Sequence, residues 1–367
     1  MTKVAIIGAG IVGATAAYYL SQAPDVQVTV YDHGLGQATK AAAGIICPWF
    51  SKRRNKAWYR MARLGADFYQ TLLADLTTQG HSTNFYQQTG VFLLKKQEDK
   101  LADLLELAKT RREESPLIGD LKLLDKVAVQ QLFPGLTGFE QLLYASGGAR
   151  VDGALLTQTL LEASKLKVQQ RKVWLERLAQ GWLVEGQMYD QVILATGAWL
   201  PEILEPLGYQ VDVRPQKGQL RDYQLDCQTD SYPVVMPEGE LDIIPFAQGK
   251  ISVGASHEND QGFDLAVDQD LLEQLEEEAL TYFPALQEST VLTERVGTRA
   301  YTSDFSPFFG TVPGVSGLYA ASGLGSSGLT TGPLIGYQLA QMVLGQDLNL
   351  NLNPADYPIE SYIRKSV

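Results

Sequence analysis

The sequence has few residues that could bind a metal ion or form disulfides. Its 367 residues include two cysteines and three histidines. Cys47 and Cys227 are far apart in the chain and lack the spacing of zinc ligands or of a disulfide framework. We therefore expect no metal site. The low cysteine content is typical of a reducing compartment such as the cytoplasm.

Basic residues are also scarce. Lys and Arg number 30 against 42 Asp and Glu, which gives a formal net charge of -12. A chain of this charge would repel a phosphate backbone, so nucleic acid is not expected to be a partner. An anionic substrate would have to be bound by a locally placed arginine.

The one long uncharged stretch, from Val4 to Leu20, could be mistaken for a signal peptide or a membrane anchor. It is interrupted by Gly8, Gly10 and Gly13, and only Lys3 precedes it as a basic residue. This pattern indicates an interior strand and helix. We expect no integral membrane segment and a cytoplasmic protein.

The same stretch predicts a strand, a turn and a helix that bind a dinucleotide. Gly8 permits the tight turn, Gly10 lets a pyrophosphate approach the backbone, and Gly13 lets the helix pack closely on the strand. A second apolar strand, Val26 to Tyr31, ends at Asp32, where an acid can bind a ribose diol. These residues leave both FAD and NAD open.

Two later segments favour a flavin. Ala195 to Trp199 and Ala321 to Gly328 are small-residue turns, and each follows an apolar strand. An apolar helix from about Leu329 to Leu344 begins after the second turn. Its N-terminal amides could face the flavin pyrimidine, where negative charge accumulates on reduction. A simple NAD-binding domain does not require these segments.

We expect an α/β fold in which an FAD-binding Rossmann-like domain is interrupted by a mixed-sheet α+β substrate domain. Residues 1–80, 141–214 and 291–367 would form the FAD-binding domain, and residues 81–140 and 215–290 the substrate domain. Apolar spacing predicts helices over residues 57–76, 98–112 and 271–283. Asp152 is expected to cap another helix.

With these segments in place, the chain resembles the D-amino acid oxidase family of flavoproteins, which includes glycine oxidases, sarcosine oxidases and D-amino acid dehydrogenases. The matching segments are Lys40 to Gly44, Arg214 to Gln219, Ile244-Pro245 with Val253 to Ala255, and Gly297 to Asp304. The resemblance covers nearly the whole chain.

The resemblance implies non-covalent FAD, because the chain lacks the attachment cysteine that monomeric sarcosine oxidases carry just past the substrate arginine. It also assigns a set of residues to the cofactor. These are Gly8, Gly10, Ile11, Val12, Gly13, Asp32, Ala42, Ala43, Gly44, Ile45, Ile46, Val173, Thr196, Gly197, Trp199, Arg299, Gly323, Gly325, Ser326, Ser327, Gly328, Leu329 and Thr330. Val173 is equally compatible with a plain core position.

For the substrate, the resemblance implies that Arg299 binds a carboxylate. The implied reaction is oxidative deamination of a small amino acid, with a D-amino acid favoured, by hydride transfer from Cα to flavin N5. A glycine- or sarcosine-type secondary amine oxidase is the alternative, and a non-catalytic flavin-binding subunit is a remote one. Retention of a carboxylate-binding arginine argues against the latter. The electron acceptor stays open.

Several residues depart from the family pattern or have open roles. Asp242 stands where many relatives have a tyrosine; it either faces water or attracts a cationic group of the substrate. Ser326 replaces the arginine of glycine oxidases. Tyr301 could line the pocket or lie in the core. We expect His257 to be a loop residue. Arg295 lies four residues before Arg299, and the register of the Gly-x-Arg pattern selects Arg299 over it as the carboxylate-binding arginine.

Overall fold

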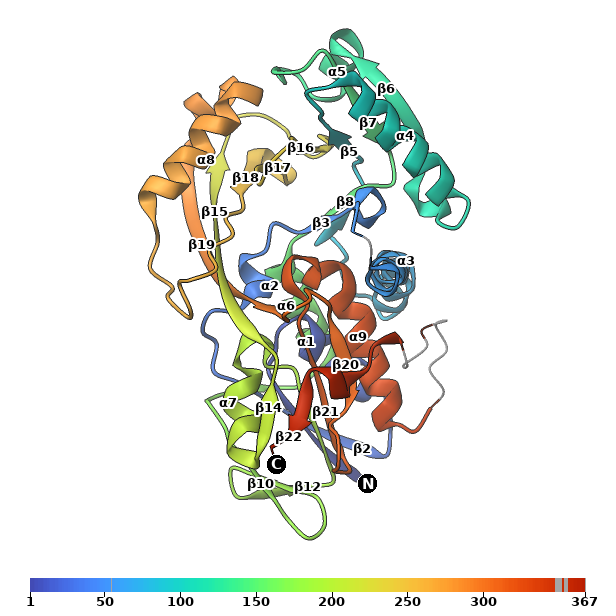
Figure 1. Ribbon diagram of the computed structural model, residues 1–367, viewed down its shortest axis with the longest axis vertical. Coiled ribbons are helices and arrows are strands. Elements are labelled where there is room, and N and C mark those ends of the chain that lie inside the picture. Colours follow the sequence, from blue (N-terminus) through green and yellow to red (C-terminus); the bar gives the residue numbers. More distant parts are fainter. Residues whose placement is uncertain (54, 347–351, 353–355, 367) are drawn as a thin grey trace.

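The computed structural model describes residues 1–53, 55–346, 352 and 356–366. Two large sheets occupy its two halves, a six-stranded one in the lower half of Figure 1 and an eight-stranded one in the upper half. The predicted combination of a Rossmann-like sheet with a second, mixed sheet is confirmed. Within the described residues, no helix is both long and apolar enough to cross a bilayer.

The six-stranded sheet contains the predicted dinucleotide-binding unit. Its order is β20 (Phe308–Thr311), β21 (Leu318–Ser322), β13 (Gln191–Leu194), β1 (Thr2–Ile7), β2 (Val26–Asp32) and β9 (Val168–Gln170). All neighbours are parallel except β20, which is antiparallel at one edge. This is the arrangement of a doubly wound α/β sheet.

Burial on both faces explains why the central strands are continuously apolar. Val4 and Ile6 pack with one hydrophobic cluster, whereas Ala5 and Ile7 pack with another. Because successive side chains of a strand point to opposite faces, both faces of β1 must be covered. The elements on the first face are α1 (Ile11–Leu20), α6 (Gly153–Ser164) and α9 (Gly328–Val343), and on the second face the small sheet β10 (Leu175–Arg177), β11 (Trp182–Val184) and β12 (Gln187–Tyr189).

The eight-stranded sheet is mixed. Its order is β19 (Thr290–Tyr301), β15 (Arg214–Gln224), β18 (Lys250–Gly254), β17 (Asp242–Pro245), β16 (Val234–Met236), β5 (Val91–Leu93), β7 (Gln141–Ala145) and β6 (Leu121–Asp125). Only β16 and β5 pair in parallel.

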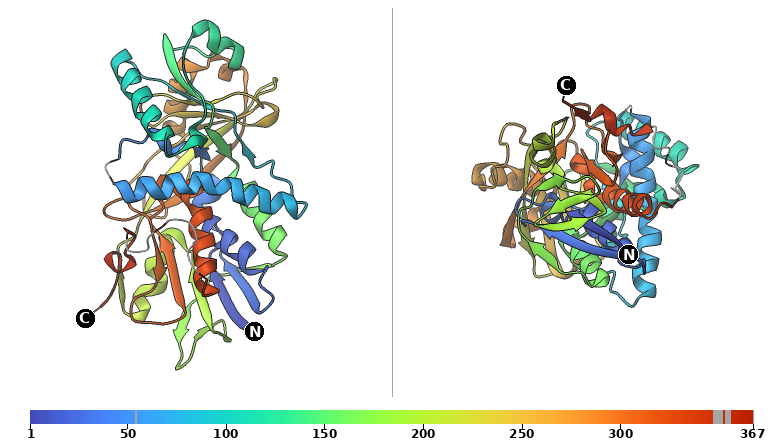
Figure 2. Two further views of the ribbon diagram at one scale, coloured as in Figure 1. Left: turned by 90° about the vertical axis from the view of Figure 1, so that its right-hand side faces the viewer. Right: turned by 90° about the horizontal axis from the view of Figure 1, so that it is seen from below.

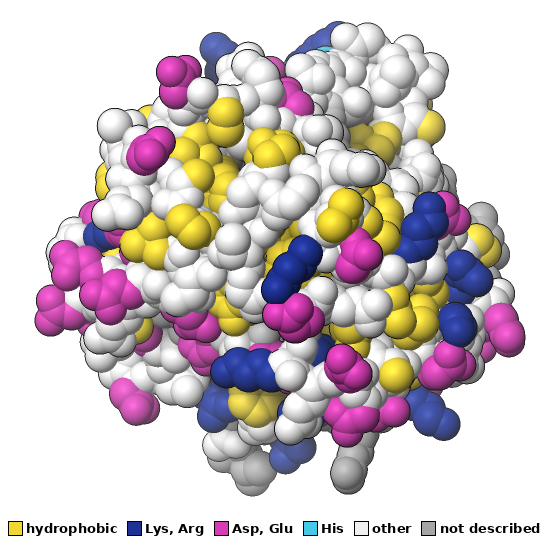
Figure 3. All heavy atoms as spheres, turned by 90° about the horizontal axis from the view of Figure 1, so that it is seen from above, with side chains coloured by type: hydrophobic (Ala, Val, Ile, Leu, Met, Phe, Trp, Pro, Cys, Tyr) yellow, Lys and Arg dark blue, Asp and Glu magenta, His cyan; other side chains and the backbone are white. Residues whose placement is uncertain are grey.

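Helices cover both faces of this sheet. Helices α8 (Gln269–Tyr282) and α5 (Lys126–Leu132) pack on one face, and α4 (Glu98–Arg112) packs on the other. Helix α8 buries Leu272, Leu275 and Ala279, and most of its acidic side chains are exposed. Seen from above, acidic side chains gather at the left, on the side where α8 lies in Figure 1 (Figure 3).

Two features join the halves. Strands β15 and β19 are antiparallel and pair from Arg214 opposite Tyr301 to Gln224 opposite Thr290. Side by side, they extend between the upper and the lower half (Figure 1). Helix α3 (Lys56–Thr78) lies across the molecule between the halves (Figure 2) and packs on α9. The remaining elements are α2 (Ala38–Ala41), α7 (Leu200–Leu204), β3 (Ile45–Ile46), β4 (Tyr86–Gln87), β8 (Ala149–Val151), β14 (Tyr209–Val211) and β22 (Ile363–Lys365).

The helices expected from apolar spacing are confirmed as α3, α4 and α8, with ends shifted by at most two residues. Asp152 caps α6, and its carboxylate accepts a hydrogen bond from the amide of Leu155 at 3.0 Å. Strands β7 and most of β19 pair within the eight-stranded sheet, although the expected boundaries give them to the FAD-binding domain. The domain boundaries stay a prediction, and residues 347–351, 353–355 and 367 of the last piece lie outside the described residues.

Candidate active site

A cavity of about 660 Å³ is lined by residues of both halves. Its volume is within the usual range for small-molecule and cofactor sites. We call one part of it the glycine end, lined by Gly8, Gly10, Asp32, Val173 and Trp199, and the other part the arginine end, lined by Met236, Asp242, Ala255, His257 and Arg299.

The three glycines of the first loop have different surroundings. A Cβ on Gly13 would lie 1.8 Å from the carbonyl oxygen of Gly8, so only glycine allows this close approach. A Cβ on Gly10 would meet only the Thr39 hydroxyl oxygen, at 3.3 Å. Gly13 therefore packs α1 on the turn, whereas Gly10 leaves the backbone at the start of α1 open to the cavity.

Asp32 ends β2 at the cavity wall and is 9% exposed. One carboxylate oxygen accepts a hydrogen bond from the amide of Ala9 and the other from the amide of Gly34, both at 2.5 Å. The carboxylate is thus fixed in position, and its free lone pairs can still accept hydrogen bonds from a ribose diol. Thr39, which the sequence analysis did not single out, accepts a hydrogen bond from the amide of Ile11 at 3.1 Å.

The loop before α9 lines the middle of the cavity. The amide of Ser326 donates to the Tyr301 hydroxyl oxygen at 3.1 Å, so this amide has a partner within the protein. A Cβ on Gly325 would lie 2.6 Å from the ring of Tyr301. The Ser326 amide is therefore already paired, two residues before α9 begins. Tyr301 is 4% exposed and supports the loop from behind.

Most of the residues assigned to cofactor and substrate line this cavity, and four do not. Gly13 packs on Gly8, Ile46 lies in the core at 1% exposure, and Tyr301 lies beneath Gly325. Gly323 packs against the backbone of Ser306, where a Cβ would lie 2.7 Å from the Ser306 carbonyl oxygen. The residues that do line it are Gly8, Gly10, Ile11, Val12, Asp32, Ala42, Ala43, Gly44, Ile45, Val173, Thr196, Gly197, Trp199, Asp242, Arg299, Gly325, Ser326, Ser327, Gly328, Leu329 and Thr330.

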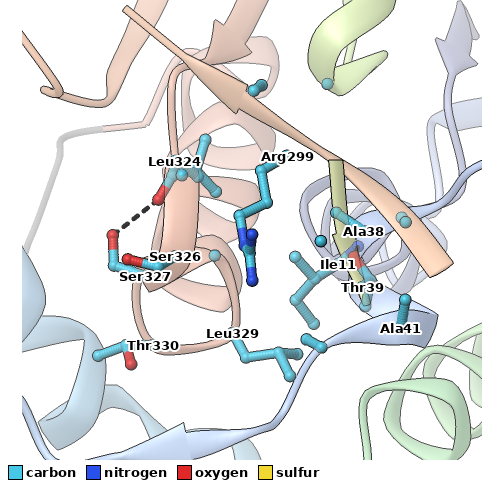
Figure 4. A pocket seen from close by; sticks show the side chains of 18 of the residues that line it. Ile11, Ala38, Thr39, Ala41, Arg299, Leu324, Ser326, Ser327, Leu329 and Thr330 are labelled. Carbon is cyan, nitrogen blue, oxygen red and sulfur yellow. Dashed lines mark hydrogen bonds between the residues drawn. The ribbon is translucent and has the colours of Figure 1, made fainter. Parts of the chain in front are cut away.

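Arg299 extends from β19 into the cavity, toward the loop that carries Ser326 and Ser327 (Figure 4). One terminal nitrogen of its guanidinium, Nη1, donates to the carbonyl oxygen of Ser256 at 2.7 Å. A Cβ on Gly218, in the neighbouring strand β15, would lie 2.3 Å from Nη1. Gly218 therefore makes room for the guanidinium. Burial lowers the pKa of Arg299 from its usual value, and nearby Glu240 and Glu258 oppose that shift.

A polar cluster behind Arg299 holds the Ser256 carbonyl in place. The hydroxyl of Ser256 donates to the carboxylate of Glu258 at 2.6 Å. The Lys217 ammonium, whose side chain is 4% exposed, lies 3.9 Å from Glu258 and 2.9 Å from Asp264. This cluster fixes one side of the guanidinium and leaves the other side facing the cavity.

Arg295 does not line the cavity, whereas Arg299 does. The Arg295 guanidinium donates at 2.8 Å to Asp222, whose side chain is 1% exposed, and at 3.0 Å to the carbonyl oxygen of Ala42. Asp222 also lies 3.3 Å from the Lys250 ammonium. Arg295 therefore ties the eight-stranded sheet to the small-residue loop that lines the cavity.

His257 lies in the loop after β18, as expected, and this loop borders the arginine end of the cavity. Its Nδ1 lies 3.6 Å from the carboxylate of Glu240. Burial and the Arg299 charge lower the pKa of His257, and Glu240 partly opposes this. The only sequence signal for His257 was its place just beyond the hairpin that pairs with β15.

Comparisons with known proteins decide between the flavin and nicotinamide alternatives. Residues 3–342 match the family described as FAD dependent oxidoreductase. The chain belongs to this family. It is 40% identical to an uncharacterized oxidoreductase of Bacillus subtilis, over 97% of this chain and 98% of that protein. It is 28% identical to a glycine oxidase of Pseudomonas aeruginosa, over 97% and 98% of the two chains.

Two solved structures are similar over the whole fold. An iminodiacetate oxidase from a Chelativorans species has a TM-score of 0.90 and 33% identity, with 98% of each chain covered. A glycine oxidase from Geobacillus kaustophilus has a TM-score of 0.82 and 21% identity, covering 96% of this chain and 98% of that one. The predicted family, its flavin cofactor and an oxidoreductase activity are confirmed.

The residues around the cavity fit FAD. The backbone at Gly10 is open, and the Asp32 carboxylate is held at the wall. Among the described residues, three buried oxygens of cavity-lining side chains lack hydrogen-bond partners, namely those of Gln37, Thr196 and Thr298. Buried polar atoms are rarely left unpaired, so these three oxygens are suited to hydrogen bonds with a polar ligand along this wall.

Proposed function

We propose that the chain oxidises a small amino acid at its Cα–N bond, that Arg299 binds the substrate carboxylate, and that FAD is held without a covalent link. The observation that carries the proposal is the geometry of Arg299. One edge of the guanidinium is fixed by Ser256, and the rest faces a cavity bordered by the loop before α9. A carboxylate bound there would place the adjoining Cα near the cofactor.

The protein contributes binding and orientation. FAD, when bound, supplies the two-electron acceptor that takes a hydride from Cα. The imine product then hydrolyses to an oxo acid and ammonia. Partial enclosure of Arg299 strengthens its attraction for a carboxylate, because fewer water molecules compete for the charge. Cys47 is the only cysteine among the cavity-lining residues, and burial raises the pKa of its thiol, which makes it a poor nucleophile.

A secondary amine with a second carboxylate is a competing substrate class. Lys52, Arg53 and Lys95 also line the cavity, so a second anionic group could be bound there. The similarity to an iminodiacetate oxidase supports this alternative. A primary D-amino acid stays the first proposal, because it needs only the carboxylate site at Arg299.

An anaerobic substrate screen tests both proposals. The purified holoprotein would be mixed without oxygen with glycine, sarcosine, iminodiacetate and the D- and L-forms of alanine and proline. Loss of flavin absorbance identifies an electron donor, and reduction by dithionite shows that the flavin is competent. Bleaching by an amino acid supports the proposed function, and bleaching by iminodiacetate alone favours the secondary-amine class. If only dithionite bleaches the flavin, the proposed function is overturned.

A further inference from the structure

Asp242 occupies an unusual position at the arginine end. It is the first residue of β17, lies opposite Gly254 of β18, and lines the cavity. Its carboxyl group forms no hydrogen bond or ion pair with any of the described residues. Asp222, a buried acid of the same sheet, does have ionic partners in Arg295 and Lys250.

Asp242 lies close to the residue that follows the cofactor loop, and it has no ionic partner among the described residues. Cys47, which directly follows the small-residue loop and β3, is close enough for the Asp242 charge to raise the pKa of its thiol further. The other charged or titratable groups at this end are Glu240 in the preceding turn, His257 beyond β18 and Arg299 on β19. The ionic partners of these groups do not include Asp242.

The arginine end therefore carries one guanidinium and one carboxyl group that are not paired with each other. A zwitterionic amino acid carries the complementary charges on adjoining atoms. With its carboxylate at Arg299, its ammonium group would need a negative partner, because burying an unpaired charge is costly.

We propose that Asp242 binds the substrate amine and accepts its proton before the Cα–H bond breaks. This inference rests on the proposed function. The ammonium group transfers one proton to the Asp242 carboxylate, which yields a neutral amine and a carboxylic acid. The nitrogen lone pair then forms the C=N bond of an iminium ion as a hydride leaves Cα, and bound FAD would supply the two-electron acceptor for that hydride. The proton on Asp242 leaves to water after the product departs.

The electrostatics of the site suit this step. Burial raises the pKa of Asp242 to about 8, closer to the pKa of an amine than that of an exposed carboxyl group. A proton acceptor works best when its pKa lies near the working pH. In the wild type, kcat/KM should therefore rise with pH until Asp242 is ionised.

The test is the pH profile of flavin reduction in Asp242→Asn, measured with the best substrate of the screen. The asparagine cannot accept a proton, so only substrate that is already neutral at nitrogen would react. In the wild type, kcat/KM should rise with pH around the pKa of Asp242. In Asp242→Asn, we expect this rise to shift upward to the pKa of the free substrate amine. The loss should be roughly 10- to 100-fold at neutral pH and less than about 3-fold where that amine is itself neutral.

Two variants and one ligand act as controls. Glu238→Gln removes an acid four residues away that lies outside the cavity, and it should keep the wild-type profile. Asp242→Glu keeps a carboxyl group, so its kcat/KM should rise at a lower pH than that of Asp242→Asn. Propionate, which has a carboxylate but no amine, should perturb the flavin spectrum with the same Kd in Asp242→Asn and in the wild type.

The outcomes separate the two proposals. If an amino acid reduces the wild type and kcat/KM of Asp242→Asn rises at the same pH as in the wild type, the role of Asp242 is overturned and the proposed function stands. An equal loss at every pH, or a loss of propionate binding, would mean that Asp242 only shapes the pocket. If no amino acid reduces the wild-type flavin, both proposals fail.

Discussion

The glycine end and the arginine end of the cavity are built in different ways. At the glycine end, backbone forms part of the wall, and Gly8, Gly10 and Asp32 all belong to one strand-turn-helix and the strand after it. At the arginine end, side chains from β17, β19 and the segment after β18 converge across the sheet. A cofactor shared by a whole family can be held by backbone geometry, whereas a particular substrate has to be recognised by side chains.

The largest expected effect tests the backbone character of the glycine end. Gly10→Val adds a side chain where the backbone now faces the cavity and should lower FAD affinity by roughly 100-fold or more, about 2.7 kcal/mol. The protein should still fold, because Gly10 has room for a Cβ. The ratio of flavin to protein absorbance and the far-ultraviolet circular dichroism measure the two effects.

Gly13→Val is the matched comparison. Its Cβ would collide with the Gly8 carbonyl oxygen, so this variant should lose its fold as well as its colour. If Gly10→Val binds FAD like the wild type, the cofactor does not approach the backbone at this turn.

At the arginine end, Arg299→Ala removes a charge-assisted contact worth roughly 2 to 4 kcal/mol. Reduction of the flavin by amino acid should slow by roughly 30- to 1000-fold, at about 1.4 kcal/mol per factor of ten. Stopped-flow absorbance under anaerobic conditions gives the rate. Arg299→Lys should recover only part of it, because an ammonium group cannot donate two parallel hydrogen bonds. Unchanged rates would show that another residue binds the carboxylate.

A further variant tests the contact that Arg295 makes between the eight-stranded sheet and the small-residue loop. Arg295→Gln leaves the buried Asp222 with Lys250 as its remaining ionic partner and frees the Ala42 carbonyl oxygen. Because breaking a buried ion pair leaves a charge uncompensated, we expect a loss of about 2 to 4 kcal/mol in the free energy of unfolding. Urea denaturation of the FAD-saturated protein measures it. A surface role for Arg295 would instead leave stability within about 0.5 kcal/mol.

The smallest effect concerns stability at Asp242 without substrate. Its pKa is raised to about 8, so the folded state holds a proton that the unfolded chain releases near pH 4. This contribution is complete below about pH 4 and is lost as the pH rises toward 8. Asp242→Asn cannot ionise and should be more stable than the wild type by roughly 1 to 3 kcal/mol at pH 8, with little difference at pH 4. Melting curves at the two pH values would show it, and equal differences at both would contradict it.

Local sequence was sufficient for much of the fold. Helices α3, α4 and α8 follow from apolar spacing, and the α6 cap follows from a single aspartate, because these elements depend on neighbours three or four residues away. The strand pairing of the eight-stranded sheet did not follow. β5 pairs with β16, and the two strands are far apart in the chain. No local pattern contains that information.

By itself, the sequence determined the glycine end. The turn at Gly8, the opening at Gly10 and the acid at Asp32 are set by spacing along the chain and by the conformations that glycine allows. Only the tertiary structure decided the arginine end. It placed Gly218 of one strand beneath Arg299 of the next, buried Arg295 against Asp222, and brought His257 and Asp242 into one cavity. The physical reason is that these positions depend on which strands pair and on what they bury, and both are settled by packing between distant segments.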